Sequence, residues 1–168
     1  IEEHTQNELQ ENFVRKYPEN KVSEDRFYKI ASSIKDALIV INPESKVTYW
    51  NPAAEKTFGY TMDETIGKKI HELVVPKSMP KEGKNSIKES LKTFSETGIG
   101  YFTVGNVEVV GRRKDGSEFP AELSISPVNL DEQWSAVGVV KDISNRKKAE
   151  QKLRDAEQRY HALFNQSP

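Results

Sequence analysis

The pair His71-Glu72 has the side chains of this sequence that could most readily carry out chemistry. An imidazole beside a carboxylate can work as a general acid or base, and a histidine can bind zinc. A zinc-protease helix needs a second histidine, which this segment lacks, and no nucleophile is paired with a base at a recognisable spacing. A small hydrolase built on this pair is therefore disfavoured. We expect no catalytic residues and no metal ligands in the chain.

The segment His71–Pro76, with the sequence HELVVP, also resembles the H-E-L-x-x-P phosphoacceptor box of histidine kinases. That chemistry requires an exposed histidine on a long helical hairpin, followed by an ATP-binding domain. Strand-like sequence follows here instead, and no glycine-rich motif that could cradle a nucleotide is present. We interpret the likeness as a coincidence and His71 as an ordinary surface or core residue.

The composition excludes several classes of function. The formal net charge is −1, so the chain lacks the basic excess that nucleic-acid backbones demand. The absence of cysteine excludes disulfides, thiolate metal sites and thiol catalysis, and it suits a cytoplasmic location. The longest apolar run, Ala37–Ile41, is far shorter than the roughly 20 residues that cross a bilayer. We expect no contact with nucleic acid and no membrane contact by this segment.

The stretch Gly111–Ser126 predicts a β-hairpin. Its Asp115-Gly116 dipeptide favours a two-residue turn in which both residues adopt positive φ. After the turn, apolar and polar residues alternate, so one face of the strand should contact a core. The apolar positions are Phe119, Ala121, Leu123 and Ile125. A third strand, Ala136–Ser144, should run directly into a charged helix.

The rest of the chain predicts short helices and one earlier hairpin. The first two helices are a loosely amphipathic one within residues 1–22 that ends before Pro18 and a second one capped by Ser23. Strands follow at 37–41 and 46–50. After them come a helix capped by Asn51 and ended by Gly59, a helical turn around 63–66, and a helix over 81–95. Two strands, several helices and three further strands indicate an α+β fold with one five-stranded antiparallel sheet and the helices on one face.

The space between such a sheet and its helices is a natural ligand pocket. Its candidate lining combines the apolar positions of the long helix with those of the last two strands: Ile87, Leu91, Phe94, Ala121, Leu123, Ile125, Gly138 and Val140. The same residues could equally form a filled core without a ligand, because apolar lining serves both purposes. Gly138 favours open space, since a strand glycine often marks a close approach.

Three segments together resemble a PAS sensor domain with its C-terminal PAC motif. They are ALIVINPESKVTYWNPAAEKTFGYTMDETIGKKIHELV, GRRKDGSEFPAELSIS and GVVKDIS, in family order and spacing within residues 23–145. The resemblance implies the PAS fold and a non-catalytic input module that senses and dimerises in a signalling protein. A two-component sensor histidine kinase is the expected parent, with a cyclic-dinucleotide enzyme or a transcription regulator as alternatives.

The flanking segments fit the same interpretation. Residues 1–22 are expected to be a peripheral helical extension. Beyond residue 145, apolar residues recur at spacings of 4, 3, 4 and 3 and predict a coiled-coil dimer seam, although a solvated single helix is the alternative. The seam residues are Ala149, Leu153, Ala156, Tyr160 and Leu163. The sequence from Ala156 to Pro168 resembles the opening of another PAS domain, so residues 146–168 should form a connector to a tandem copy.

The cofactors of PAS domains can be compared with the residue types present. Cysteinyl-flavin photochemistry requires a reactive cysteine near Gly67–Val74, and this chain has none. In haem oxygen sensors, the resemblance places an axial histidine and a distal arginine at the positions of Ile87 and Val107, so we expect no haem of that type. Any ligand is unknown; a small apolar or mixed-polarity molecule is one possibility and an empty protein-binding scaffold the other.

Signal transmission is expected at the end of the last strand. The resemblance implies that Asp142 ties this strand to the connector through an ion pair, for which Arg146, Arg112 and Arg113 are candidate partners. Asp142 or Ser144 could also simply cap the helix that follows. The two roles are compatible, because a cap at the exit strand can also be a hinge.

Overall fold

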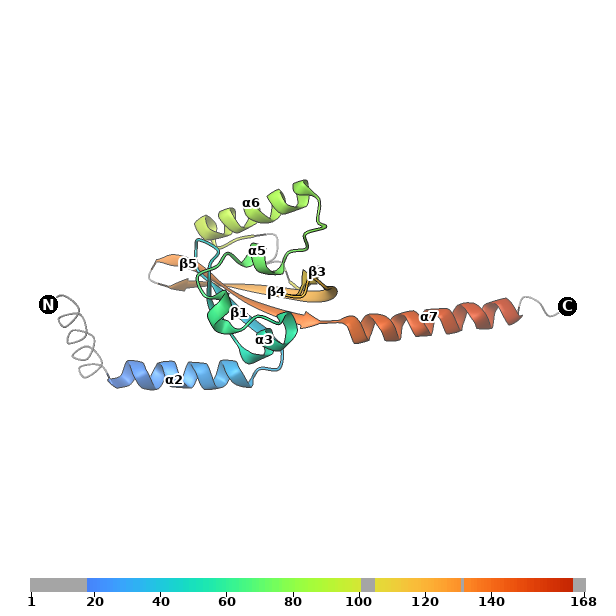
Figure 1. Ribbon diagram of the computed structural model, residues 1–168, viewed down its shortest axis with the longest axis horizontal. Coiled ribbons are helices and arrows are strands. Elements are labelled where there is room, and N and C mark those ends of the chain that lie inside the picture. The colour runs from blue at the N-terminus through green and yellow to red at the C-terminus, as the bar shows by residue number, and fades with distance from the viewer. Residues whose placement is uncertain (1–17, 101–104, 131, 165–168) are drawn as a thin grey trace. The chain divides into compact units, whose positions relative to one another are not determined.

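The computed structural model describes residues 18–100, 105–130 and 132–164. The chain divides into two compact units, one ending at Lys35 and one beginning at Asp36. The second unit contains a five-stranded antiparallel sheet in the order β2-β1-β5-β4-β3 (Figure 1). The strands are β1 (Ala37–Ile41), β2 (Val47–Trp50), β3 (Val107–Arg112), β4 (Glu118–Leu130) and β5 (Gln133–Asp142). The predicted α+β class with one five-stranded antiparallel sheet is confirmed.

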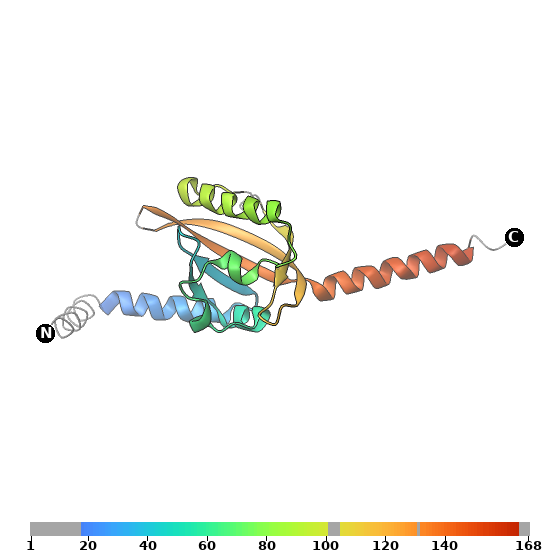
Figure 2. The same ribbon diagram turned by 45° about the horizontal axis from the view of Figure 1, so that its top comes forward.

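Short helices between β2 and β3 cover one face of the sheet (Figure 2). They are α3 (Pro52–Phe58), α4 (Met62–Thr65), α5 (Ile70–Val74) and α6 (Lys81–Thr97). The core between these layers includes Trp50, Phe58 and Phe119, whose rings pack in sequence with centroids 5.3 and 5.6 Å apart. Helix α7 (Ser144–Phe164) begins two residues after β5 ends.

Asn51 caps α3, as its position before Pro52 predicted. Its side-chain oxygen accepts a hydrogen bond from the Ala54 amide at 2.8 Å. The same oxygen accepts from the Leu38 amide at 2.9 Å, and the side-chain amide donates to the Asp36 carbonyl at 3.1 Å. This fully buried side chain therefore joins α3 to the beginning of β1 as well as capping the helix.

The unit before Asp36 differs from the expectation. Helix α2 spans Pro18–Ser33 and passes through Ser23, so the predicted helix start at Ser23 is wrong. Proline is well placed in the first turn of a helix, because its missing N–H is not needed there. Nothing in the next fifteen residues interrupts the helical backbone. The remaining part of the predicted first helix, residues 1–17, lies outside the described residues.

The turn between β3 and β4 has three residues, Lys114, Asp115 and Gly116, so the predicted two-residue turn is wrong. The Gly116 amide donates to the Arg113 carbonyl at 3.0 Å, and only Gly116 within this turn has positive φ, at 88°. The Asp115 carboxylate instead accepts from the Ser117 amide at 2.9 Å. This is a β-turn closed by a left-handed glycine, the common geometry for a three-residue hairpin loop.

The alternating pattern of β4 is confirmed. Phe119 and Ala121 are buried, while Leu123 and Ile125 are partly buried and pack against the core. The strand continues beyond the predicted end at Ser126, because its hydrogen bonding with β5 persists to the Leu130–Gln133 pair. The two longest strands, β5 at the centre of the sheet and β4 beside it, therefore form one continuous wall beneath α6.

Candidate functional site

Two adjoining hollows lie beside α5 and α6, with volumes of about 320 and 300 Å³. They share three lining residues, His71, Glu72 and Lys88. We call the larger one, which also reaches Arg112 on β3, the α5–α6 hollow. Its lining residues are His71, Glu72, Val75, Pro76, Lys77, Lys84, Ile87, Lys88 and Arg112. It is the larger of the two hollows described here and the candidate ligand site.

The residues predicted to line a pocket are divided between the hollows and the core. Ile87 lines the α5–α6 hollow and Leu91 lines the smaller one. The others face the core side of the sheet: Phe94, Ala121 and Val140 are buried, Leu123 and Ile125 are partly buried against the core, and Gly138 pairs with Ile39 and Ile125. A Cβ at Gly138 would meet only the Ile39 carbonyl, at 3.8 Å, so this strand position has room.

The polar lining of the hollow was missed in the sequence. Its basic residues come from three separate segments. Lys77 precedes α6, Lys84 and Lys88 lie on α6, and Arg112 ends β3. Helical spacing could have placed Lys84, Lys88 and Leu91 on one side of α6 with Ile87. No local signal connects that side of α6 with Arg112, which is distant in the sequence.

Arg112 joins β3 to the end of α5. Its side chain is only 9% exposed, and its Nη2 donates to the carbonyls of Glu72, at 2.5 Å, and Leu73, at 3.1 Å. These carbonyls belong to the last turn of α5, where no further helical amide can pair with them. The Nε of Arg112 is buried and has no hydrogen-bond partner among the described residues.

His71 forms part of the wall of both hollows. Its Nδ1 is buried and also lacks a hydrogen-bond partner among the described residues. Burial lowers the pKa of His71 below 6.5, the nearby carboxylate of Glu72 raises it, and Lys88 and Lys69 lower it again. The imidazole is therefore neutral at pH 7, with an unused hydrogen-bonding position.

Asp142 pairs with Arg113, one of the three arginines that the sequence left open. The Arg113 Nη2 lies 2.6 Å from the Asp142 Oδ2, and the Ser144 amide donates to Oδ1 at 2.9 Å. Arg113 also donates to the carbonyl of Thr57 in α3 and lies 4.0 Å above the centre of the Phe119 ring. One guanidinium thus connects the exit of β5 with α3 and the core.

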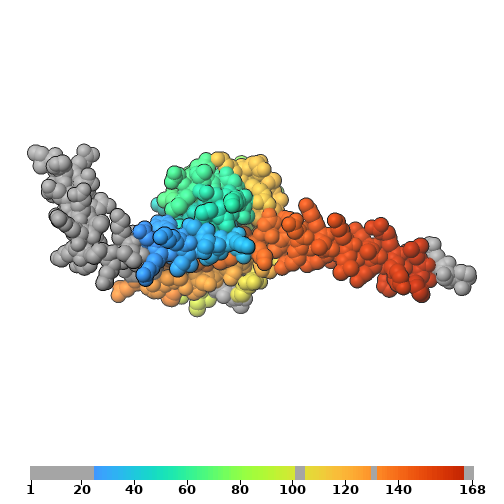
Figure 3. Space-filling model, turned by 90° about the horizontal axis from the view of Figure 1, so that it is seen from below, coloured from blue at the N-terminus to red at the C-terminus, as the bar shows by residue number. Residues whose placement is uncertain are grey.

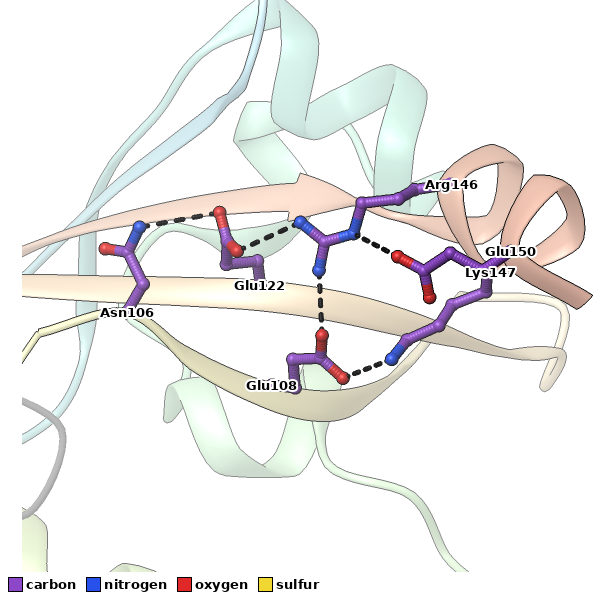
Figure 4. A network of polar contacts seen from close by, with 6 residues as sticks. All are labelled: Asn106, Glu108, Glu122, Arg146, Lys147 and Glu150. Carbon is purple, nitrogen blue, oxygen red and sulfur yellow. Dashed lines mark hydrogen bonds and ion pairs between the residues drawn. The ribbon is translucent and has the colours of Figure 1, made fainter. Parts of the chain in front are cut away.

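Arg146 contacts other carboxylates, so the prediction that it could pair with Asp142 is wrong (Figure 4). Its guanidinium lies 2.8 Å from Glu108, 3.3 Å from Glu122 and 3.7 Å from Glu150. Glu108 and Glu122 are opposite each other on β3 and β4, and together they attract the arginine. Lys147 also contacts Glu108, at 2.5 Å.

The electrostatic effect of this cluster is mutual. The hydrogen bond from Lys147 lowers the pKa of Glu108, and the bond from Arg146 adds to that lowering. The hydrogen bond to Glu122 raises the pKa of Arg146, and Glu108 adds to it. Both shifts favour the ionised forms of Glu108 and Arg146. The first turn of α7 is therefore tied to two strands through opposite charges.

The predicted seam residues of α7 are all exposed. Leu153 is 63% exposed, Tyr160 is 61% and Leu163 is 71%, and Ala149 and Ala156 are exposed as well. Figure 3 shows the side of α7 that faces the viewer without any other described element over it. Within the described residues, the helix buries none of its own side chains. An apolar stripe on an exposed helix is typical of a surface that pairs with another helix.

The sheet, its helical cover and the helix that leaves the last strand define an input domain of the kind used in signalling proteins. The PAS domain family matches residues 35–145, and this chain belongs to that family. PAS domains are generally non-catalytic.

Proteins similar to this chain include sensors and histidine kinases. It is 26% identical over 136 residues to the sensor protein FixL of Bradyrhizobium diazoefficiens, and 28% identical over 127 residues to the cell-division control histidine kinase PdhS of Brucella anthropi. These matches cover 80% and 76% of this chain but only 26% and 11% of the relatives. The chain thus spans about a quarter or less of their length.

A solved structure agrees on the fold. The PAS domain of an HTR-like protein from Haloarcula marismortui superposes with a TM-score of 0.57 at 19% identity. That match covers 77% of this chain and 98% of the archaeal domain. It supports the PAS architecture of the part of the chain that the structure describes.

The two positions used to argue against haem lie on α6 and β3. Ile87 lines the α5–α6 hollow, and Val107 pairs with Leu123. Neither side chain can ligate iron or donate a hydrogen bond. Across residues 18–100, 105–130 and 132–164, no group of three or more His, Cys, Asp or Glu could hold a metal ion. The same residues include no helix long and apolar enough to span a membrane.

Proposed function

We propose that this chain is the sensory and dimerisation module of a two-component sensor histidine kinase and works in the cytoplasm. The observation that carries the proposal is the exposed apolar stripe of α7, which follows β5 directly. The similarity to histidine kinases and sensors supports the assignment. The domain would couple the state of a ligand or partner to the orientation of a helix pair.

Two sets of contacts support this coupling. Arg113 connects Asp142 with α3 and the Phe119 ring, so a change in the core can reach the residue at the exit of β5. Arg146 and Lys147 hold the first turn of α7 to Glu108 and Glu122. Both sets of contacts involve the short segment from Asp142 to Lys147. A shift of β3 relative to β5 would therefore be transmitted to this segment and would rotate α7.

The domain boundaries of the proposal follow the sequence. Residues 1–22 would be an extension, 23–145 a PAS domain with its PAC motif, and 146–168 a connector to a second PAS copy. A ligand-free scaffold for protein contacts is the alternative, and the buried positions of Phe94, Ala121 and Val140 favour it. Both versions require the dimer seam.

Leu153→Glu should dissociate the dimer. A charge at the centre of a short apolar seam would be buried without a partner, and we expect the dimer Kd to rise at least about tenfold, equivalent to about 1.4 kcal/mol. Sedimentation equilibrium of the 168-residue chain measures this change. Gln158→Glu is the matched control, because it adds the same charge at an exposed α7 position outside the seam. A wild-type chain that stays monomeric at about 100 μM, well above a 1 μM Kd, would contradict the seam.

A further inference from the structure

The α5–α6 hollow contains two buried polar atoms that its neighbours leave unpaired. Arg112 keeps an unused Nε–H on a side chain that is only 9% exposed, and His71 keeps an unused Nδ1. Both residues line this hollow. Buried polar atoms are nearly always hydrogen-bonded, because leaving one unpaired costs about 1–3 kcal/mol. Two such atoms beside one hollow indicate a missing polar partner, and for the Arg112 Nε–H this partner must be an acceptor.

The charges around the hollow specify what that acceptor is. Four cationic side chains line it, and Glu72 is the one carboxylate among the described lining residues. Of the two α6 lysines that line the hollow, Lys84 already donates to the Lys77 carbonyl at 2.7 Å, whereas Lys88 makes no hydrogen bond described here. A cationic wall with an unused guanidinium N–H favours an oxyanion.

The remaining lining is apolar and limits the ligand's size. Val75, Pro76 and Ile87 supply this part, and the volume of about 320 Å³ suits a small organic molecule. A bare inorganic ion would leave the apolar part of the wall in contact with water. A carboxylate on a short apolar chain satisfies both parts.

We propose that the α5–α6 hollow binds a small organic carboxylate, which accepts from Arg112 and His71, lies near Lys88, and packs its apolar part on Val75, Pro76 and Ile87. This inference rests on the proposed sensory function and names its ligand class. Arg112 also holds the end of α5 and directly precedes Arg113, so the ligand would contact the neighbour of the residue that pairs with Asp142.

Binding should tighten as the pH falls. In the free protein the pKa of His71 is lowered, by burial above all. The groups around it are Glu72 and Lys69 near its own helix, Lys88 on α6 and Arg112 on β3. A bound carboxylate adds negative charge and raises the pKa of His71. At pH values between the pKa of His71 in the free protein and its pKa in the complex, binding is therefore accompanied by uptake of a proton. Affinity therefore rises as the pH is lowered through that window.

The test is an NMR titration of the ¹⁵N-labelled 168-residue chain with sodium propionate and, separately, with inorganic phosphate. We expect propionate to give saturable shifts at residues 71–77 and 84–88, and a tighter Kd at pH 6 than at pH 8. Lys88→Gln should weaken propionate binding at least threefold, whereas Lys81→Gln, on the same helix but outside the hollow, should leave it unchanged. Arg112→Lys should also weaken it, with folding checked by the spectrum itself.

Three results would overturn the inference. The first is the absence of saturable shifts, which would mean that water alone occupies the hollow. The others are phosphate binding as tight as propionate binding, and equal affinities of Lys88→Gln and Lys81→Gln for propionate. None of these affects the dimer, which depends on α7. The sedimentation experiment on Leu153→Glu tests the proposed function separately. Failure of the ligand class and failure of the module can therefore be distinguished.

Discussion

Asn51→Ala is expected to lower the free energy of unfolding by about 3–5 kcal/mol, because it removes three hydrogen bonds at a fully buried position. The amides of Leu38 and Ala54 and the carbonyl of Asp36 would all lose their partner. Each buried group left unpaired costs about 1–3 kcal/mol, and the smaller alanine adds a void. The loss should shift the Tm by about 10 °C for a domain of this size.

Chemical denaturation followed by circular dichroism measures the effect. Asn42→Ala is the control, since Asn42 accepts one hydrogen bond, from the Lys46 amide at 2.9 Å, in an exposed turn. That change should cost about 1 kcal/mol or less. Equal losses for the two variants would show that Asn51 acts only as a local cap.

Asp142→Asn is expected to abolish most of the signalling response of the full-length protein while the domain stays folded. Partial burial alone would raise the pKa of Asp142, but the hydrogen bonds from Ser144 and the Arg113 guanidinium lower it below 3.8. A lowered folded pKa stabilises the domain above the unfolded pKa, and this contribution is lost as the pH falls through the folded value. The ion pair is therefore intact throughout the physiological range.

The energetic cost of this substitution should be small. The Arg113 and Asp142 side chains are 28% and 33% exposed, so solvent screening limits the pair to about 1 kcal/mol or less. Asparagine can still accept from the Ser144 amide, so the start of α7 is kept. What is lost is the charge that holds Arg113 between the exit of β5 and α3.

Phosphorylation output of the proposed parent kinase and the Tm of the isolated chain measure the two sides of this prediction. Asp155→Asn is the matched control, because Asp155 lies on α7 and bonds to Gln151 and Arg159 of the same helix. A large fall in Tm with unchanged output would assign Asp142 a structural role. An effect of Asp155→Asn equal to that of Asp142→Asn would show a general response to charge loss on the connector.

Local patterns in the sequence were sufficient for most elements of the fold. The cap at Asn51, the left-handed glycine after Phe58 and the alternation in β4 depend on residues within a few positions of one another. The same reasoning was wrong where two local solutions compete. Asp115-Gly116 could form a two-residue or a three-residue turn, and the second helix could begin at Ser23 or at Pro18.

The candidate site was less predictable. Ile87 and Leu91 were placed correctly on one side of a helix, but the cations around the hollow were not found. Arg112 meets the Glu72 carbonyl across 40 positions, and Arg146 meets Glu108 across 38. Charged side chains are long and can reach many partners, so no pattern within one element indicates which contact forms.

The sequence by itself determined the strand order along the chain, the buried faces, the absence of cysteine chemistry and the apolar spacing of α7. These follow from backbone geometry and from residue types that act over one or two turns. Only the tertiary structure decided that Asp142 pairs with Arg113, that Arg146 binds two strands, and that His71 and Arg112 share one hollow. These contacts depend on how the sheet brings distant segments together, because hydrogen bonds and ion pairs act only at short range.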